Sequence, residues 1–219
     1  MTLRAQLWLP LLLCAAACSS VPPRRTYLLT PPVNPTAPAT TTSSPAGDPM
    51  APRQRLEVRR VLVPDYLDST DILTRSGSDE VKVSATGRWG ERLSLGVTHA
   101  VGADLAARVP QYSIVQDGSS NPQRQLRITI TALDLWQNGR CVLAANWTIV
   151  EQGSSIPVTS GSGTFDSLNA SGTQTVTDSG LVEAVARTLG TLADRIVRDA
   201  PASPEHADLR GDPKKLAAD

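Results

Sequence analysis

Hydrophobic and polar residues alternate along much of the middle of the chain, which is the two-residue period of half-buried β-strands. The cleanest alternation lies at 126–131, where apolar residues take the even positions and Arg or Thr the odd ones. Asn138-Gly139 follows, and this dipeptide favours the tight turn of a hairpin. The next strand carries one apolar row, made of Cys141, Leu143, Ala145, Trp147 and Ile149. We therefore predict two long antiparallel strands joined at Asn138-Gly139.

Shorter apolar runs bounded by Gly, Pro or Asp predict the remaining strands. One run occupies 56–63 and stops at Pro64-Asp65. A turn at Gly153 leads into another strand at 156–165. Three further strands are expected at Ile72-Leu73, at 80–83 beyond a turn that contains Gly77, and at 112–115.

Two segments instead repeat their apolar residues every three or four positions, the period of an amphipathic helix. The first begins at Leu93, runs for about 17 residues and is closed by Pro110. The second extends from about 174 to 199 and is terminated by Pro201. The apolar stripes are Leu93, Val97, Ala100, Val101 and Leu105 in the first helix, and Leu181, Val185, Leu189, Leu192 and Ile196 in the second.

The order along the chain is strands, helix, strands, helix. Each helix has one apolar stripe to bury, so we expect the helices to pack together against one side of a sheet. The sequence thus predicts a mixed α/β fold, a two-layer sandwich in which a mixed β-sheet carries two main helices on one face. The hydrophobic pattern does not predict the order in which the strands lie side by side in the sheet.

An apolar run precedes Cys18 near the start of the chain. It occupies 7–17, follows Arg4, and is shorter than the roughly 20 residues that span a bilayer. Small residues precede the cysteine and suit cleavage there, although Ala15 stands where a bulky aliphatic residue is usual. These features predict a lipoprotein signal peptide at 1–17, with a diacylglycerol and an N-acyl lipid attached to Cys18.

Two other interpretations of this segment stay open: a plain secretory peptide cut after Ala15-Ala16-Ala17, and a buried core helix. The polar residues after Cys18 favour acylation, because a lipid anchor is usually followed by a flexible tether. Asp directly after the lipidated cysteine commonly retains lipoproteins on the inner membrane, and here that residue is Ser19. The sequence therefore predicts the periplasmic face of the outer membrane.

Residues 19–53 are rich in Pro, Thr, Ser and Ala and cannot bury enough apolar surface to fold by themselves. A short β-prone run at 26–29 interrupts them. If it docks as an edge strand, the tether reaches roughly 25 Å; if not, it extends to Pro52 and reaches on the order of 100 Å. The predicted organisation is a signal peptide at 1–17, a lipidated tether at 18–25, a domain at 26–200 with a Pro-rich disordered insert at 31–53, and a disordered tail at 201–219.

The formal charge is zero, with 21 basic and 21 acidic side chains. Cleavage after residue 17 removes only Arg4, which leaves 20 basic and 21 acidic side chains and a formal charge of −1. No run of five or more like charges occurs. Nucleic-acid binding and a polybasic membrane patch are therefore not expected, and membrane attachment would come from the lipid.

Few side chains offer chemistry. Cys141 would be the one cysteine left after cleavage and acylation, so no intramolecular disulfide is expected; a small buried hydrophobe is its ordinary role and a reactive thiol the alternative. His99 lies opposite the apolar stripe of its helix and His206 lies in the tail, so no nucleophilic triad can be assembled.

Three carboxylates, Asp65, Asp68 and Asp71, lie close together, but they lack the glycine and glutamate of a calcium loop. Capping of turns and helices is the favoured role. The Gly- and Ser-rich features within 153–172 lack the lysine of a phosphate loop and are interpreted as hairpin turns and strand ends. We expect no catalytic residue, no metal and no cofactor other than the covalent lipid.

Three linked motifs are more specific. A strand ends in Val63-Pro64-Asp65-Tyr66-Leu67-Asp68, the step Arg88-Trp89-Gly90-Glu91 opens the first helix, and the last helix contains Leu181-Val182-Glu183-Ala184-Val185. Together they resemble the PqiC-type (paraquat-inducible protein C) ABC-transport auxiliary lipoproteins, over nearly the whole mature chain. The Pro-rich insert is longer than this family leads us to expect.

The resemblance implies a non-catalytic lipoprotein on the periplasmic face of the outer membrane. Members work beside mammalian-cell-entry (MCE) domain proteins of the PqiB type, which carry lipids between the two membranes and support envelope integrity. The lipoprotein would dock the far end of that system and form a homo-oligomeric ring. A scaffold lipoprotein of another envelope assembly and a small periplasmic lipid carrier are the alternatives.

If the chain docks a partner, the loop 66–71 and the segment 88–92 are candidate contact surfaces. The candidate partner-binding residues are Tyr66, Asp68, Arg88, Trp89 and Arg92. Trp89 is the preferred one, since aromatic and Arg side chains dominate interface energetics. The alternative places Trp89 in the core beneath the start of the helix.

Overall fold

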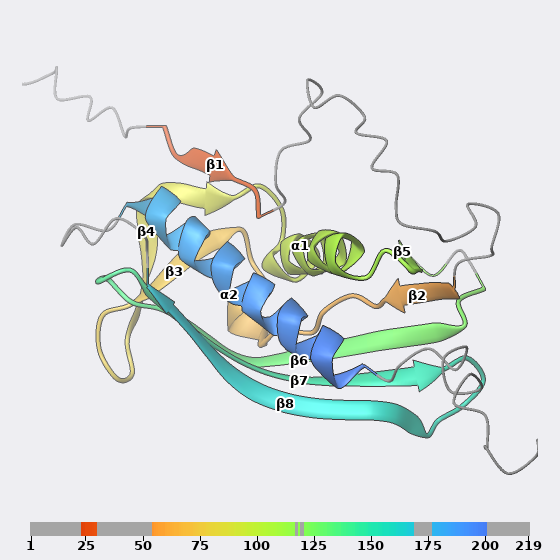
Figure 1. The fold of residues 1–219 in the computed structure, drawn as a ribbon. Coiled ribbons are helices and arrows are strands. Elements are labelled where there is room, and N and C mark those ends of the chain that lie inside the picture. Colours follow the sequence, from red (N-terminus) through yellow and green to blue (C-terminus); the bar gives the residue numbers. More distant parts are fainter. Residues whose placement is uncertain (1–22, 30–53, 117, 119–120, 169–176, 201–219) are drawn as a thin grey trace, which may run out of the picture.

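The computed structural model describes residues 23–29, 54–116, 118, 121–168 and 177–200. Cys18, the predicted signal peptide, the insert and the tail lie outside the described residues. The described elements are shown in Figure 1. In chain order they are β1 (Arg25–Tyr27), β2 (Gln54–Val58), the 3₁₀-helix η1 (Asp65–Leu67), β3 (Asp71–Arg75), β4 (Val81–Trp89), α1 (Leu93–Arg108), β5 (Tyr112–Val115), β6 (Arg124–Leu135), β7 (Arg140–Glu151), β8 (Pro157–Leu168) and α2 (Asp178–Asp199).

Five strands form a larger sheet in the order β5-β2-β6-β7-β8. The long strand β7 is antiparallel to both of its neighbours, β6 and β8, whereas β2 is parallel to both β5 and β6. The predicted turn between β6 and β7 is confirmed, and Gly139 there has a φ of 82°, a left-handed conformation that glycine adopts readily. The predicted apolar row of β7 is also confirmed, because all five of its side chains are buried.

Three strands form a smaller sheet in the order β1-β4-β3. β1 is parallel to β4, with Tyr27 opposite Trp89, and β3 is antiparallel to β4. The short run before the Pro-rich insert therefore docks as an edge strand, and Leu29 directly after it is buried in the core. Of the two tether lengths left open by the sequence, this pairing supports the shorter.

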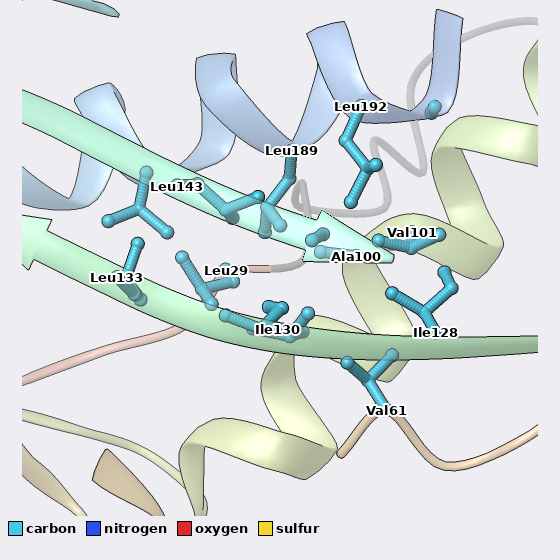
Figure 2. Packing of buried hydrophobic residues seen from close by; sticks show 14 of the residues in the cluster. Leu29, Val61, Ala100, Val101, Ile128, Ile130, Leu133, Leu143, Leu189 and Leu192 are labelled. Carbon is cyan, nitrogen blue, oxygen red and sulfur yellow. The ribbon is translucent and has the colours of Figure 1, made fainter. Parts of the chain in front are cut away.

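Both helices lie on one side of the larger sheet (Figure 1). Thr177 caps α2, since its Oγ1 accepts a hydrogen bond from the Gly180 N–H at 3.3 Å. The two predicted helical stripes are buried and meet the inward rows of β6 and β7 in a single core (Figure 2). Burying each large aliphatic side chain contributes about 1.5–3 kcal/mol, so this shared core is the main source of stability.

The opposite face of the larger sheet is not covered by any described element (Figure 1). Its exposed side chains are mostly polar, and they include Arg127, Thr129, Thr131, Asn146, Ser160, Ser162, Thr164 and Asp166. One face of the sheet thus holds the core and the other faces solvent, which explains the alternation seen in the sequence.

The mixed α/β class with two helices is confirmed, with its strands divided between two sheets. The strand predicted at 56–63 ends at Val58. The chain then leaves the sheet because the Val61 N–H donates to Thr98 Oγ1 on α1 at 2.9 Å, and only Leu62 returns to bridge Thr129.

Two further expectations about boundaries need correction. The second helix begins at Asp178 and not at 174. Residues 160–163 lie inside β8 and not in a turn or at a strand end. Glycine is needed at that point because a Cβ on Gly161 would lie 2.5 Å from Cζ2 of the buried Trp147.

Candidate docking surface

A loop from an earlier part of the chain caps the start of α1. Arg92 stands at the N-cap position and supplies no side-chain cap. Instead, Asp68 Oδ1 accepts a hydrogen bond from the Ser94 N–H at 3.2 Å, and the Ser69 carbonyl accepts one from the Leu93 N–H at 3.1 Å. The favoured role for Asp68, capping, is therefore what the structure shows, although the capped helix lies 26 residues away.

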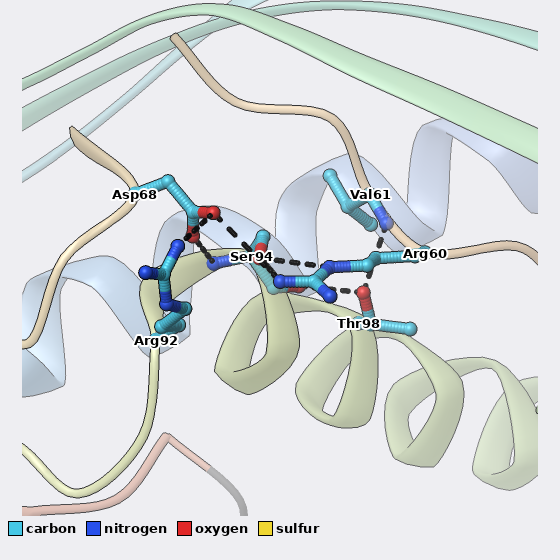
Figure 3. A network of polar contacts seen from close by, with 6 residues as sticks. All are labelled: Arg60, Val61, Asp68, Arg92, Ser94 and Thr98. Carbon is cyan, nitrogen blue, oxygen red and sulfur yellow. Dashed lines mark hydrogen bonds and ion pairs between the residues drawn. The ribbon is translucent and has the colours of Figure 1, made fainter. Parts of the chain in front are cut away.

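The same carboxylate joins two arginines (Figure 3). Arg92 Nη1 lies 3.3 Å and Arg60 Nη2 lies 3.7 Å from Asp68 Oδ2. Arg60 also donates from Nε and Nη2 to Ser94 Oγ, at 3.1 and 2.7 Å. This cluster of Arg60, Asp68, Arg92 and Ser94, called here the α1 cap cluster, fastens the loop and the segment after β2 to one helix end.

Electrostatics in the α1 cap cluster favour the charged carboxylate. Desolvation raises the pKa of Asp68, but the hydrogen bonds from Ser94 and the Arg92 guanidinium outweigh it and hold that pKa below its usual range. The N-terminus of a helix also favours a negative charge at this position. Asp68 is thus charged and held in place at neutral pH.

Of the other candidate residues, Tyr66 and Arg92 lie in the part of the surface that contains Asp68, whereas Arg88 does not. Tyr66 on η1 is 51% exposed, and Arg92 is exposed on the adjoining turn. The structure therefore brings Tyr66, Asp68 and Arg92 to one region of the surface through the loop and the start of α1. Arg88 lies elsewhere, exposed on β4, where its Nε donates to Thr26 Oγ1 at 3.4 Å.

Trp89 requires a correction. Its side chain is only 4% exposed and belongs to the hydrophobic core, so it is not available as a surface anchor in this structure. It also ends β4 and does not open α1, which begins at Leu93. The reason is strand parity: Gly87 and Trp89 face inward while Arg88 between them faces outward.

Arg60, Ser94 and Thr98 were not found by sequence reasoning, yet they complete the polar contacts at this end of α1. Ser94 and Thr98 are buried polar residues one turn apart on the apolar side of the helix. Their hydroxyls interrupt an otherwise apolar stripe, and that interruption was the available signal. Arg60 carried no such signal, because its hydrogen-bond partner Ser94 lies 34 residues away.

The described residues offer little for catalysis. No group of three or more potential metal ligands occurs among them. Burial raises the pKa of the Cys141 thiol to about 11, so this buried thiol stays protonated, the inert role expected for it. His99 Nδ1 lies 3.1 Å from Glu91 Oε1 at a partly exposed position on α1.

The cavities are equally modest within the described residues. An apolar cavity between α1, α2 and the larger sheet measures about 20 Å³, which is the space of a single water molecule. Two larger hollows of about 400 Å³ are open grooves, and the one beside Arg59 and Arg127 is also lined by the apolar side chain of Leu62. Neither described helix is long and apolar enough to cross a membrane.

Comparison with known proteins decides the family. Residues 27–197 match the family described as the ABC-type transport auxiliary lipoprotein component. The chain belongs to this family. The family is a transport component and not an enzyme family, and its match confirms the resemblance drawn from the three motifs.

Two curated proteins are similar to part of the chain. The intermembrane transport lipoproteins PqiC of Escherichia coli (strain K12) and of Shigella flexneri are each 22% identical over 98 residues, or 45% of this chain. The match spans about half the length of those relatives, 52%.

Solved structures share the fold. A crystal structure of an uncharacterised protein covers 80% of this chain and 97% of its own, with a TM-score of 0.61 at 17% identity. Protein XCC0632 from Xanthomonas campestris covers 68% and 86%, with a TM-score of 0.53 at 15% identity. These likenesses concern the fold alone.

Proposed function

We propose that this family member is anchored through Cys18 in the periplasmic leaflet of the outer membrane and docks an MCE-type lipid transport system that works between the two membranes. The observation that carries the proposal is the family match over 27–197. The partial similarity to an intermembrane transport lipoprotein supports it further. In this role the chain contributes to envelope integrity without catalysis.

The docking of β1 supports a platform close to the membrane. Arg25 begins β1 and lies seven positions after Cys18 in the sequence, a reach of roughly 25 Å. A three-chain lipid anchor holds a protein firmly, whereas one acyl chain is marginal. The short connection therefore holds the domain near the leaflet, where a docking platform must stand.

The closed core favours docking over lipid carriage. The apolar cavity of about 20 Å³ is far too small for an acyl chain. We propose two contacts for the partner: the exposed Tyr66, and Arg92, which forms an ion pair with Asp68. A homo-oligomeric ring would present several copies of this surface at once.

The test begins with the tagged full-length protein, solubilised from its own outer membrane. We expect an MCE-domain protein to co-purify, and to be lost from a Cys18→Ala variant because its anchor is gone. Recovery of a secretin, an efflux component or a cell-wall protein in its place would overturn the transport assignment. Fractionation of the wild type with the inner membrane would overturn the location.

A second experiment addresses the contact surface. Tyr66→Ala should reduce co-purification of the MCE-domain protein while leaving stability within about 0.5 kcal/mol, as is usual for exposed positions. Thr131→Ala, on the uncovered face of the larger sheet, is the matched control and should leave co-purification unchanged. Equal losses in both variants would argue against the loop as the contact.

A further inference from the structure

The last strand of the larger sheet leaves one edge of its backbone unpaired. β8 pairs with β7, and no other described strand lies beyond it in the sheet. In an antiparallel strand, every second residue directs its N–H and C=O away from the neighbour with which the strand pairs. Among the described residues, Arg187 donates to the Leu168 carbonyl at the end of β8, whereas the backbone of 157–167 bonds to no element other than β7.

β8 is also the longest edge strand in the described part of the chain. It has 12 residues, whereas the other edge strands, β1, β3 and β5, have 3, 5 and 4. Proteins usually protect an edge with charged side chains, proline, a bulge or a covering element. In β8 these features are confined to the ends, where Pro157 and Asp166 lie, and the stretch 158–165 has no charged residue and no proline.

Helix α2 covers one face of β8 and leaves its edge free. On the covered face, Ser167 Oγ donates to the Ala184 carbonyl at 2.8 Å, and Phe165 is buried. On the other face, Ser160 and Ser162 are exposed. Figure 1 shows β8 as the outermost strand of the larger sheet, with α2 above the sheet. The edge is therefore accessible to a further strand.

A second copy of β8 fits this edge in the antiparallel direction. Facing residues must lie on the same face of the joined sheet, and a pairing centred on Ser162 meets that condition. Hydroxyl pairs and aromatic–β-branched pairs stabilise antiparallel strands, and like charges that face each other destabilise them. No like charges face each other in this register, whose pairs are Ser162 with Ser162, Ser160 with Thr164, Thr159 with Phe165, and Val158 with Asp166.

The same arrangement keeps both membrane anchors on one side. A two-fold axis perpendicular to the joined sheet relates the two copies, so both carry their helices on the same side. β1 lies on that side as well (Figure 1), and Leu29 after it packs against α1, 3.6 Å from where a Cβ on Gly96 would lie. Both copies of the proposed anchor at Cys18 can therefore reach one membrane, which favours a second copy as the occupant of the edge.

We infer that two copies of this chain pair through β8, antiparallel and centred on Ser162, so that their larger sheets form one continuous sheet. The inference rests on the proposed self-association and names its contact. A two-fold contact is complete with two copies, so a ring needs a second contact in addition to this one.

Disulfide trapping in the lipidated full-length protein, in its own membrane, tests the register. Ser162→Cys places two thiols opposite each other, at the Cα separation of about 4.5–5.5 Å that a disulfide spans. Ser160→Cys is the matched control, because its thiol lies four positions, or roughly 13 Å, from the thiol of the second copy. Cys141 is buried, and the wild-type chain shows whether Cys18 forms any bridge.

We expect a covalent dimer from Ser162→Cys after mild oxidation and none from Ser160→Cys alone. A chain that carries both Ser160→Cys and Thr164→Cys should form the dimer again. Ser162→Lys places like charges opposite each other and should weaken self-association about fivefold in sedimentation of the detergent-solubilised protein, with an unchanged thermal midpoint at this exposed position. Thr131→Lys, on the uncovered face but away from the edge, should leave self-association unchanged.

Three outcomes would overturn the inference. Equal cross-linking of Ser162→Cys and Ser160→Cys would show that β8 is not paired in this register. Absence of a dimer in every cysteine variant, from protein that still co-purifies an MCE-domain protein, would remove the β8 contact and leave the proposed docking role in place. Loss of that MCE-domain protein from Ser162→Lys, without any change in self-association, would assign the edge to the transport partner.

Discussion

Arg88 and Trp89 are neighbours in sequence, yet they face opposite sides of β4. Trp89 lies in the core, while Arg88 is exposed and reaches Thr26 across the strand pair. In a strand, a shift of one position exchanges core and solvent. This parity, more than residue type, decides which of the two can meet a partner.

Replacing Trp89 with Ala should lower the free energy of unfolding by about 3–5 kcal/mol, because a large side chain leaves an unfilled space in a packed core. Urea denaturation would measure the loss. Trp89→Phe should lower the free energy of unfolding by less than Trp89→Ala does, and Arg88→Ala should change it by no more than about 0.5 kcal/mol. A Trp89→Ala variant of unchanged stability that captures less partner would instead indicate an interface role.

Asp68 acts at the residue scale through its charge. Its pKa is lowered in the folded chain, so the unfolded chain binds its proton more readily. The stabilisation is therefore complete above the unfolded pKa of about 3.9 and is lost as the pH falls through the lower folded value.

Accordingly, Asp68→Ala should destabilise the protein by about 1–2 kcal/mol at neutral pH, where both the helix cap and the ion pair are lost. The difference in free energy of unfolding between this variant and the wild type should become smaller as the pH falls below about 4. Asp68→Asn retains an acceptor oxygen and should lose less. Unfolding curves at neutral and acidic pH measure this, and a difference independent of pH would exclude a role for the charge.

At the scale of elements, β8 shows how packing selects residues that local preference disfavours. Glycine weakens a strand interior, yet Gly161 and Gly163 both lie in β8. Gly161 leaves space for Trp147, and Gly163 lies close to Phe165. The indole of Trp147 thus packs against the backbone of β8 where Gly161 has no side chain.

Gly161→Ala should therefore destabilise the fold by about 1–3 kcal/mol, the usual cost of overpacking. The added methyl group would meet Trp147 at 2.5 Å, which forces the indole or the strand to move. Thermal unfolding of this variant would be compared with Gly77→Ala, whose new methyl group meets no atom within 4 Å. Equal thermal midpoints for the Gly161→Ala and Gly77→Ala variants would mean that the Trp147 side chain moves aside without loss of stability.

At the scale of the whole molecule, the closed core fits the proposed docking platform better than a lipid carrier. We expect native mass spectrometry of protein released from its anchor to show the protein mass without bound phospholipid, because the described part holds no apolar cavity of acyl-chain size. A species carrying phospholipid at stoichiometric occupancy would favour the carrier. Protein from the same preparation that keeps its lipid anchor serves as the control, because it shows how much phospholipid is carried along by the anchor alone.

Much of the fold was predictable because periodicity is local. The alternation at 126–131, the turn at Asn138-Gly139 and the two helical stripes each lie within a few residues, and each is confirmed. The ends of the helices and strands were harder to predict from the sequence. The strand β2 ends at Val58, and the Val61 N–H then bonds to Thr98 on α1, a contact that nothing nearby in the sequence reveals.

The candidate site was predictable only in part. The motif around Tyr66 and Asp68 marked the correct loop, but the same kind of reasoning placed Trp89 on the surface. It also gave no sign of the α1 cap cluster, in which Asp68 contacts residues 24 and 26 positions away.

By itself, the sequence determined the class of fold, the type of each main element and the family, since these follow from local patterns and short motifs. Tertiary structure alone decided that the strands form two sheets, that Trp89 is buried, and that Asp68 caps a distant helix. The physical reason is shared: each depends on strand pairing that joins residues about sixty positions apart, such as Thr26 and Arg88, or on a loop that packs against a remote helix end.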